Sequence, residues 1–186
     1  MNRPALRRAV RVTKADTTGF RCGEQKLDHY FKKYAVDNDG LGIGRTFVLH
    51  RDINDDPSLP TVLGFFTLSM ADIESASAST LLGGRQLPQY EMPVARIARL
   101  AVHKRAQKKG FGELLLVSAF DQVLEGADHV GCVAVMVDAK HERAASFYSR
   151  YGFVALSPPT KWPWPMFIAM QDVRLSFAAA SMPDSA

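Results

Sequence analysis

The stretch RIARLAVHKRAQKKGFG, residues Arg96 to Gly112, determines how the rest of the chain can be interpreted. Its first part is apolar, as a strand would be, and its last part is a Lys-rich turn with two glycines, Gly110 and Gly112. An apolar, helix-like run, residues 113–124, follows at once. The first N–H groups of a helix lack internal partners, the helix dipole is positive there, and glycine lets a phosphate approach the backbone. The stretch therefore predicts a phosphate-binding turn at the start of a helix.

Composition indicates the class of protein. The chain has 186 residues, of which 47% are apolar, so we expect one globular domain with a full core. The net charge of +4 suits an anionic partner without proving one. The two cysteines, Cys22 and Cys132, match no disulfide framework or metal spacing, so no metal is expected. There is no signal-peptide core and no apolar run of the ~20 residues that a membrane helix needs, which predicts a cytoplasmic protein without membrane contact.

Hydrophobic periodicity predicts an α/β domain over residues 1–175, with a flexible tail from 176 to 186. Strands 45–49 and 61–70, joined by a polar turn, are expected to form an antiparallel hairpin. The β-branched run 131–138 is typical of a strand buried on both faces. Helices are expected at residues 23–38, 113–124 and 140–150, with a short one after Ser75. The remaining predicted strands are one near Val10 and Val12, then 97–102, 152–156 and 166–170.

Two spaced motifs carry a family resemblance. The turn Gln107-x-x-Gly110-x-Gly112, followed ~35 residues on by Ala144-x-x-Phe147-Tyr148-x-x-x-Gly152-Phe153, resembles the GNAT superfamily of N-acetyltransferases. The resemblance implies a GNAT fold, a central mixed and mostly antiparallel twisted sheet of about six or seven strands with about four helices. It also implies that the turn binds the pyrophosphate of acetyl-CoA, the co-substrate. The cofactor-binding residues that it assigns are Leu100, Ala101, Val102, Gln107, Lys108, Lys109, Gly110, Phe111 and Gly112.

A narrower resemblance covers most of the chain. Four motifs carry it: Gly19-Phe20-x-Cys22-Gly23-x-x-x-Leu27-Asp28-x-Tyr30-Phe31, Arg45-Thr46-Phe47-Val48, Gly64-Phe65-Phe66-Thr67-Leu68-Ser69 and Arg99-Leu100-Ala101-Val102. With these motifs the chain resembles the acetyltransferase toxins of bacterial toxin–antitoxin modules. The resemblance implies acetylation of the α-amine of aminoacyl-tRNA, which blocks translation, and also a ribbon-helix-helix antitoxin as partner and a homodimer. One departure is Trp164-Pro165, where the family usually carries Asp-Pro, and it concerns the acceptor-facing wall.

Tyr148 is the candidate catalytic residue, as general acid. Attack of an amine on a thioester expels a thiolate, which needs a proton. A phenol with a pKa near ~10 stays protonated at neutral pH and can supply that proton. The alternative is core packing, because Ala144, Tyr148 and Tyr151 lie at helical spacing. The position of Tyr148 in the resembled family favours catalysis, whereas Tyr151 is expected in the core.

The general base is missing from the predicted central strand, which holds no Glu or Asp between residues 94 and 103. A lysine amine with a pKa of ~10.4 is neutral at pH 7 in about one part in a few thousand, but an α-amine near ~7.7–8.0 in roughly one part in ten. The absence of a base therefore favours an α-amine acceptor, with water taking the proton. We assign His103 to the basic turn, and Asp138 to a turn or cap before the next helix.

Three arginines are candidates for a surface that binds the acceptor substrate. Arg45, Arg96 and Arg99 are the candidate substrate-binding residues, as part of a phosphate-binding surface for RNA. For each of them, a solubilising surface charge is the alternative. Trp162 and Trp164 either stack on the substrate or cover the core. Two other functions stay open at this point, transfer to a small-molecule or protein amine, and a non-catalytic acyl-CoA-binding module.

Overall fold

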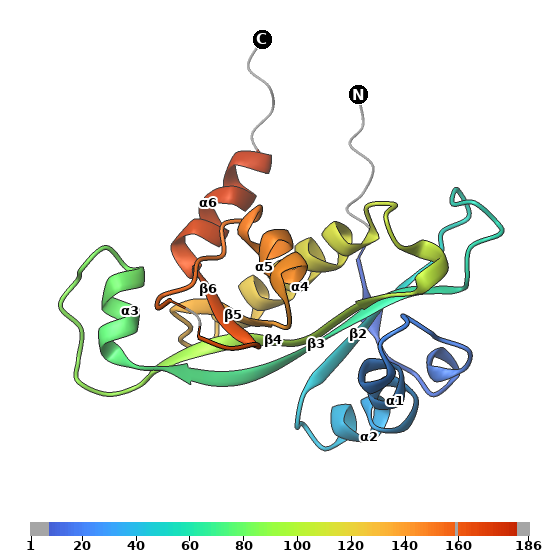
Figure 1. Cartoon of the computed structure of the whole chain (residues 1–186), viewed down its shortest axis with the longest axis horizontal. Coiled ribbons are helices and arrows are strands. Elements are labelled where there is room, and N and C mark those ends of the chain that lie inside the picture. Colours follow the sequence, from blue (N-terminus) through green and yellow to red (C-terminus); the bar gives the residue numbers. More distant parts are fainter. Residues whose placement is uncertain (1–7, 159, 182–186) are drawn as a thin grey trace, which may run out of the picture. The chain divides into compact units, whose positions relative to one another are not determined.

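A computed structural model of the chain describes residues 8–158 and 160–181. These residues form an α/β fold with an open sheet of six strands in the order β1-β2-β3-β4-β5-β6 (Figure 1). The pairs β1–β2, β2–β3 and β5–β6 are antiparallel. The expected α/β class with a mostly antiparallel sheet is thus confirmed. The strands are β1 (Val10–Arg11), β2 (Arg45–His50), β3 (Val62–Ile73), β4 (Met92–Val102), β5 (Ala134–Ala139) and β6 (Trp164–Ala169).

The described residues contain six α-helices, where about four were expected. The chain also divides into two compact units, one within residues 1–69 and 97–122 and the other within 70–96 and 123–186. Whether residues 1–175 act as a single domain stays a prediction. The helices are α1 (Gln25–Lys33), α2 (Ala35–Gly40), α3 (Ser75–Leu81), α4 (Phe111–Ala127), α5 (Glu142–Ser149) and α6 (Met170–Ser181).

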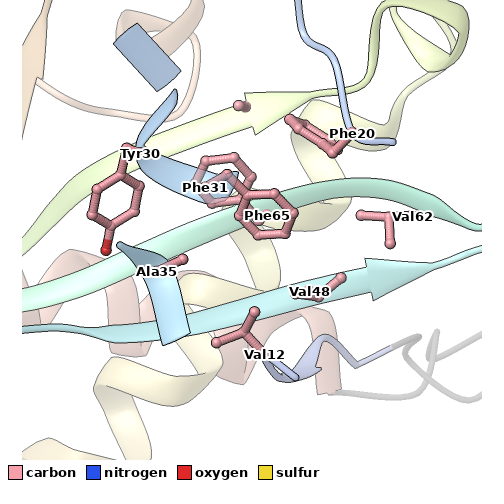
Figure 2. Close-up of a cluster of buried hydrophobic side chains, with 9 residues drawn as sticks. Val12, Phe20, Tyr30, Phe31, Ala35, Val48, Val62 and Phe65 are labelled. Atoms are coloured by element: carbon pink, nitrogen blue, oxygen red, sulfur yellow. The ribbon is translucent and has the colours of Figure 1, made fainter. Parts of the chain in front are cut away.

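The predicted hairpin of the first unit is confirmed. β2 pairs antiparallel with β3 and places Phe47 opposite Phe66 and Val48 opposite Phe65. Consecutive strand residues point to opposite faces, and Phe47, Val48, Phe65 and Phe66 are all buried, so both faces of this pair are covered. Figure 2 shows the rings of Phe31 and Phe65 against each other; they are stacked, with centroids 4.2 Å apart. Both side chains are fully buried, so replacing either with alanine is expected to cost about 3–5 kcal/mol.

The predicted helix 23–38 is interrupted at Tyr34. This residue has φ −123° and ψ −20°, outside the helical region, so α1 ends and α2 begins around it. The periodicity alone does not show this break, because Phe31 and Ala35 stay buried on both sides of it. Tyr34 itself is 50% exposed.

In the second unit, β5 and β6 pair antiparallel, with Val135 opposite Ile168 and Val137 opposite Met166. The buried strand expected at 131–138 is therefore confirmed in its second half and extends to Ala139. A small core forms around Val94, Ala134 and Phe167, to which Ile73, Ala78 and Met92 also belong.

One expected strand of this unit is wrong. Residues 152–156 form no strand but a single bridge, in which Val154 and Phe167 exchange two backbone hydrogen bonds of 2.8 Å. The chain turns at Gly152 (φ 87°) just before the bridge and bends at Leu156 just after it, which leaves room for one pair only. Residues 176–181, where the flexible tail was expected to begin, are helical as the end of α6, and their flexibility stays a prediction. The rest of that expected tail, residues 182–186, lies outside the described residues.

Candidate active site

The phosphate-binding turn predicted from the sequence is present between β4 and α4. The chain leaves β4 at Val102, makes the 3-10 helix η2 (Lys104–Ala106) and enters α4 at Phe111. Lys108 has φ 62° and Gly110 has φ 85°. Lys108 is the one non-glycine with positive φ among residues 8–158 and 160–181, and such a conformation costs an L-residue about 1–2 kcal/mol. Left-handed residues within a turn are typical of anion-binding backbone concavities.

The backbone of this turn offers free donors. Within the described part of the chain, the N–H groups of Lys108, Lys109, Gly110 and Gly112 have no hydrogen-bond acceptor. The Gly110 carbonyl accepts from the N–H groups of Glu113 (3.0 Å) and Leu114 (3.2 Å), which closes the first turn of α4. Unpaired N–H groups at the start of a 17-residue helix bind anions well. The residues present therefore fit the pyrophosphate of a coenzyme A.

Positive charge surrounds the same turn. Lys104, Arg105, Lys108 and Lys109 are all exposed. Asp56, on the β2–β3 loop, hydrogen-bonds Ser58, and together with the charges of Lys109 and Arg105 this holds the pKa of Asp56 below its usual range. The N-terminus of α4 is therefore surrounded by more cations than anions, which favours binding of an anionic ligand.

Gln107, one of the predicted cofactor-binding residues, contacts the protein's own backbone through its side chain. Its amide donates to the backbone carbonyls of Cys22 (2.8 Å) and Val102 (3.1 Å), so it braces the turn against the end of β4. Gly64 of β3 lies close to the same end. A Cβ atom at Gly64 would stand 2.6 Å from the carbonyl oxygen of Ala101 and 2.6 Å from Leu115. The backbone beside the predicted cofactor residues Leu100, Ala101 and Val102 is therefore tightly packed.

His103 belongs to the turn, as expected. Its side chain is 7% exposed, and its Nδ1 accepts a hydrogen bond from the backbone N–H of Arg105 (3.2 Å). Burial and the charge of Arg105 lower the pKa of His103. A neutral, buried imidazole that caps η2 is poorly suited to take a proton from a substrate amine.

Tyr148 lies near the end of α5. Its ring packs edge-on against Phe153 and Phe147, with centroids 5.4 Å and 5.2 Å away. Burial, and to a lesser extent the negative charge of Asp138, raise the pKa of Tyr148 to about 12. Among the described residues, no hydrogen-bond partner is found for its hydroxyl group. The phenol is thus kept protonated and is free to donate.

Asp138 is not the helix cap that we expected. It lies in β5, and its carboxylate forms an ion pair with the guanidinium of Arg96 from β4. The N-cap of α5 is His141 instead, whose ring nitrogen accepts from the N–H of Ala144 (3.2 Å). Asp138 precedes the helix in sequence, but its partner lies 42 residues away and is invisible to local analysis.

The three predicted substrate arginines have different environments. Arg45 donates to the backbone carbonyl of Asp39 (2.7 Å), and Arg96 is paired with Asp138. The guanidinium of Arg99 lies over the ring of Tyr30, 3.6 Å from its centroid.

Within the first unit, Arg99 lines a pocket of about 540 Å³. The pocket was not predicted from the sequence. A signal was present, because Lys26, Tyr30 and Tyr34 recur every four residues, the spacing of side chains that share one side of a helix. The other lining residues are Gln25 and His29.

Trp162 and Trp164 stack on each other, with centroids 3.7 Å apart and ring planes 13° apart. Trp162 is 38% exposed, and the buried Nε1 of Trp164 has no partner in the part of the chain that the structure describes. Trp162 thus stacks on a tryptophan of β6. No group of three or more metal-ligating side chains occurs among the described residues, and no helix there could cross a bilayer.

The sequence matches the family model described as acetyltransferase (GNAT) domain over residues 76–173. The chain belongs to the GNAT acetyltransferase family. It is accordingly an acetyltransferase with acetyl-CoA as co-substrate, as the free N–H groups of the β4–α4 turn suggest.

Relatives of this GNAT acetyltransferase include toxins. A tRNA-acetylating toxin of Mycobacterium tuberculosis is 34% identical over 159 residues, which cover 86% of this chain and 89% of the toxin. A probable toxin TacT of Sinorhizobium fredii is 26% identical over 86% of this chain and 87% of its own length. The similarity thus extends over both compact units of the GNAT chain.

Solved structures agree with these relatives. A mutant of KacT superimposes with a TM-score of 0.77 at 26% identity, covering 90% of this GNAT chain and 96% of KacT. AtaT in complex with acetyl-methionyl-tRNA has a TM-score of 0.73 at 26% identity, covering 87% and 91%. AtaTR bound with acetyl-CoA has a TM-score of 0.72 at 26% identity, covering 90% and 96%.

Proposed function

We propose that this GNAT acetyltransferase transfers the acetyl group of acetyl-CoA to the α-amine of aminoacyl-tRNA and acts as a toxin that blocks translation. The observation that carries the proposal is the 34% identity, over 86% of the chain, to a tRNA-acetylating toxin. The AtaT complex with acetyl-methionyl-tRNA, the product of such a reaction, supports the same substrate class.

In this proposal the β4–α4 turn holds the donor. The pyrophosphate accepts hydrogen bonds from the free N–H groups of Lys108, Lys109, Gly110 and Gly112, and the surrounding lysines balance its charge. The β4 backbone at Leu100, Ala101 and Val102 binds the pantetheine arm and the acetyl group. Phe111 and Gln107 complete the site, Phe111 as the first residue of α4 and Gln107 by bracing the turn.

Tyr148 supplies the proton. The neutral amine nitrogen attacks the thioester carbonyl carbon, a C–N bond forms, and the C–S bond breaks. The departing thiolate takes the phenolic proton of Tyr148, and the proton lost by the amine returns through solvent to the phenolate. A pKa raised to about 12 supports a phenol that is protonated before each turnover.

An α-amine acceptor does not need a strong catalytic base. His103 caps η2 and Asp138 is held by Arg96, so neither is offered as a base. An α-amine loses its proton to water at neutral pH far more readily than a lysine side chain does. The proposed substrate therefore needs no basic side chain from the enzyme.

Partners follow from the proposed role. AtaT has been solved with the C-terminus of its antitoxin AtaR, which supports an antitoxin for this chain too. We propose that it is a ribbon-helix-helix protein, that the toxin forms a homodimer, and that both are cytoplasmic, where charged tRNA is found.

The proposal is tested by incubating the enzyme with radiolabelled acetyl-CoA and charged tRNA. Label is expected at the aminoacyl end with wild-type enzyme and is expected to be lost with Tyr148→Phe. Label on a protein or on a small amine, with charged tRNA unlabelled, would overturn the substrate assignment.

A further inference from the structure

The ring of Tyr30 is a fixed platform within the first unit. The residue is 5% exposed, and its hydroxyl belongs to a buried group of three with Thr46 and Thr67. The Thr46 and Thr67 oxygens are 2.9 Å apart, and that of Tyr30 lies 3.4 Å and 3.5 Å from them. Figure 2 shows Tyr30 at the border of the aromatic core, with its hydroxyl turned away from the Phe31 and Phe65 rings. The platform cannot rotate without breaking these contacts.

Arg99 lies flat against this platform. Its guanidinium carbon is 3.6 Å from the ring centroid, a cation–π distance. No residue among those described accepts a hydrogen bond from the guanidinium or forms an ion pair with it. Arg45 and Arg96, in contrast, are occupied by a carbonyl and by a carboxylate. Arg99 therefore presents an oriented, charged group of donors that has no acceptor of its own.

The pocket beside Arg99 has the composition of a nucleotide site. It measures about 540 Å³, within the ~300–1,000 Å³ usual for ligand pockets. Its described lining contains two cations, Arg99 and Lys26, and no carboxylate. It also contains the ring pair His29 and Tyr34, with centroids 5.5 Å apart at 65°, and Tyr34 is half exposed. Exposed rings next to cations are typical of single-stranded RNA sites, where bases stack and phosphates pair with arginine.

We propose that this pocket binds one nucleotide of the single-stranded 3′ end of the RNA acceptor. The phosphodiester pairs with the guanidinium of Arg99, which is pre-oriented by Tyr30, and with Lys26. The base stacks on the exposed ring of Tyr34 at the His29 pair. This assignment rests on the proposed function and identifies Arg99 as the substrate-binding arginine among the three predicted.

The geometry favours RNA over an acidic peptide. A planar guanidinium suits phosphate and carboxylate equally, but a peptide carboxylate leaves the Tyr34 ring without a stacking partner. An RNA end contacts both parts of the pocket, with its phosphate at Arg99 and Lys26 and its base on the ring of Tyr34.

The test measures binding of a fluorescently labelled single-stranded RNA, matching the tRNA 3′ end, to the full-length enzyme at several salt concentrations. Arg99→Gln is expected to weaken binding about tenfold and to reduce the slope of log K against log salt by about 0.7, the value for one phosphate contact on a single strand. Tyr34→Ala is expected to weaken binding at least about fivefold and to leave the slope unchanged. Lys26→Gln, at an exposed side chain, provides a second charge-removing variant whose folding is not at risk.

Lys14→Gln is the matched control, since it removes one exposed cation from the same unit outside the pocket. It is expected to leave both affinity and slope nearly unchanged. If Arg99→Gln and Lys26→Gln bind RNA no worse than Lys14→Gln, the pocket assignment is wrong. Tighter binding of an acidic peptide than of RNA, lost in Arg99→Gln, would assign the pocket to a protein partner instead.

Failure of this inference is separable from failure of the proposed function. If wild-type enzyme acetylates charged tRNA and Arg99→Gln does so with unchanged KM, the function stands and the pocket assignment falls. If the enzyme acetylates no charged tRNA but binds the RNA end in an Arg99-dependent way, the pocket assignment stands and the acceptor must be found elsewhere.

Discussion

Gln107 donates a hydrogen bond from its side-chain amide to the backbone carbonyl of Cys22, a residue 85 positions earlier in the chain. A second bond reaches Val102, so one side chain connects the turn before α4 with the end of β4 and the segment before α1. These two hydrogen bonds therefore fix the position of the turn whose N–H groups are proposed to bind the pyrophosphate.

Replacement of Gln107 with alanine is expected to loosen this turn. The loss of two exposed hydrogen bonds should lower the free energy of unfolding by about 1 kcal/mol and the melting temperature by about 2–4 °C. Calorimetry should also show weaker binding of coenzyme A, because the N–H groups are no longer held in place. Gln171→Ala, at an exposed α6 position without a side-chain hydrogen bond among the described residues, is the control. An equal effect in both variants would show that the brace is unimportant.

Gly64→Ala is expected to destabilise the chain. The new methyl group would meet the Ala101 carbonyl oxygen and Leu115, each at 2.6 Å, so β3 and β4 must separate. Such overpacking typically costs about 1–3 kcal/mol, measurable by urea denaturation. Gly126→Ala is the matched control, because nothing lies within 4 Å of its Cβ position in α4 and its φ is not positive. This helix substitution should stabilise by about 0.5–1 kcal/mol.

Tyr148→Phe should remove activity without loss of structure. The hydroxyl has no partner among the described residues, so stability and coenzyme A affinity should stay near wild type while kcat falls about 10²–10⁴-fold. Because the raised pKa favours the protonated acid, deprotonation of Tyr148 should not reduce the rate below about pH 10. A Tyr148→Phe enzyme with near wild-type kcat would exclude the general-acid role.

Asp138→Asn should make Tyr148 easier to ionise. Its negative charge opposes formation of a phenolate, so its removal shifts the pKa of Tyr148 from about 12 towards the ordinary value of 10.0. The measurement is a pH titration of tyrosinate absorbance. Subtracting the curve of the double variant Asp138→Asn/Tyr148→Phe from that of Asp138→Asn leaves the titration of Tyr148 alone. An upward shift would contradict the assigned cause.

Asp16 is expected to make stability depend on acid pH. Burial tends to raise its pKa, but hydrogen bonds from His50 (2.5 Å) and from the N–H and hydroxyl of Thr13 outweigh this and lower it. The lowered pKa adds stability that is complete above the unfolded pKa near 3.8 and is lost as pH falls through the folded value. Asp16→Asn should thus be less stable than wild type at pH 7, with the difference shrinking below about pH 4. Asp72→Asn, at an exposed β3 position, should show little difference at either pH.

The fold could be predicted where local pattern and packing agree. The apolar runs at residues 45–49 and 61–70, joined by a polar turn, predicted β2 and β3, and the glycines of the Lys-rich turn predicted the start of α4. The helical spacing of Ala144, Phe147 and Tyr148 predicted a helix at 140–150, and the structure has α5 there.

The rest depended on partners distant in sequence. The pairing of Asp138 with Arg96 joins residues 42 positions apart, which no local window contains. The same holds for the Arg99 pocket, since Tyr30 becomes a platform only through Thr46 and Thr67 on two strands. The break at Tyr34 is not visible in the periodicity of residues 23–38, because Phe31 and Ala35 are buried on both sides of it. Charge alone selected Arg45, Arg96 and Arg99 equally, and only their neighbours distinguish them.

The most direct test of the central claim is mass spectrometry of the aminoacyl-adenosine released by nuclease from charged tRNA after incubation with enzyme and acetyl-CoA. We expect this fragment to be heavier by one acetyl group, with fragmentation placing it on the α-amine, and unmodified when Tyr148→Phe is used. An unmodified aminoacyl-adenosine with active wild-type enzyme, or an acetyl group on the ribose or base, would contradict the account.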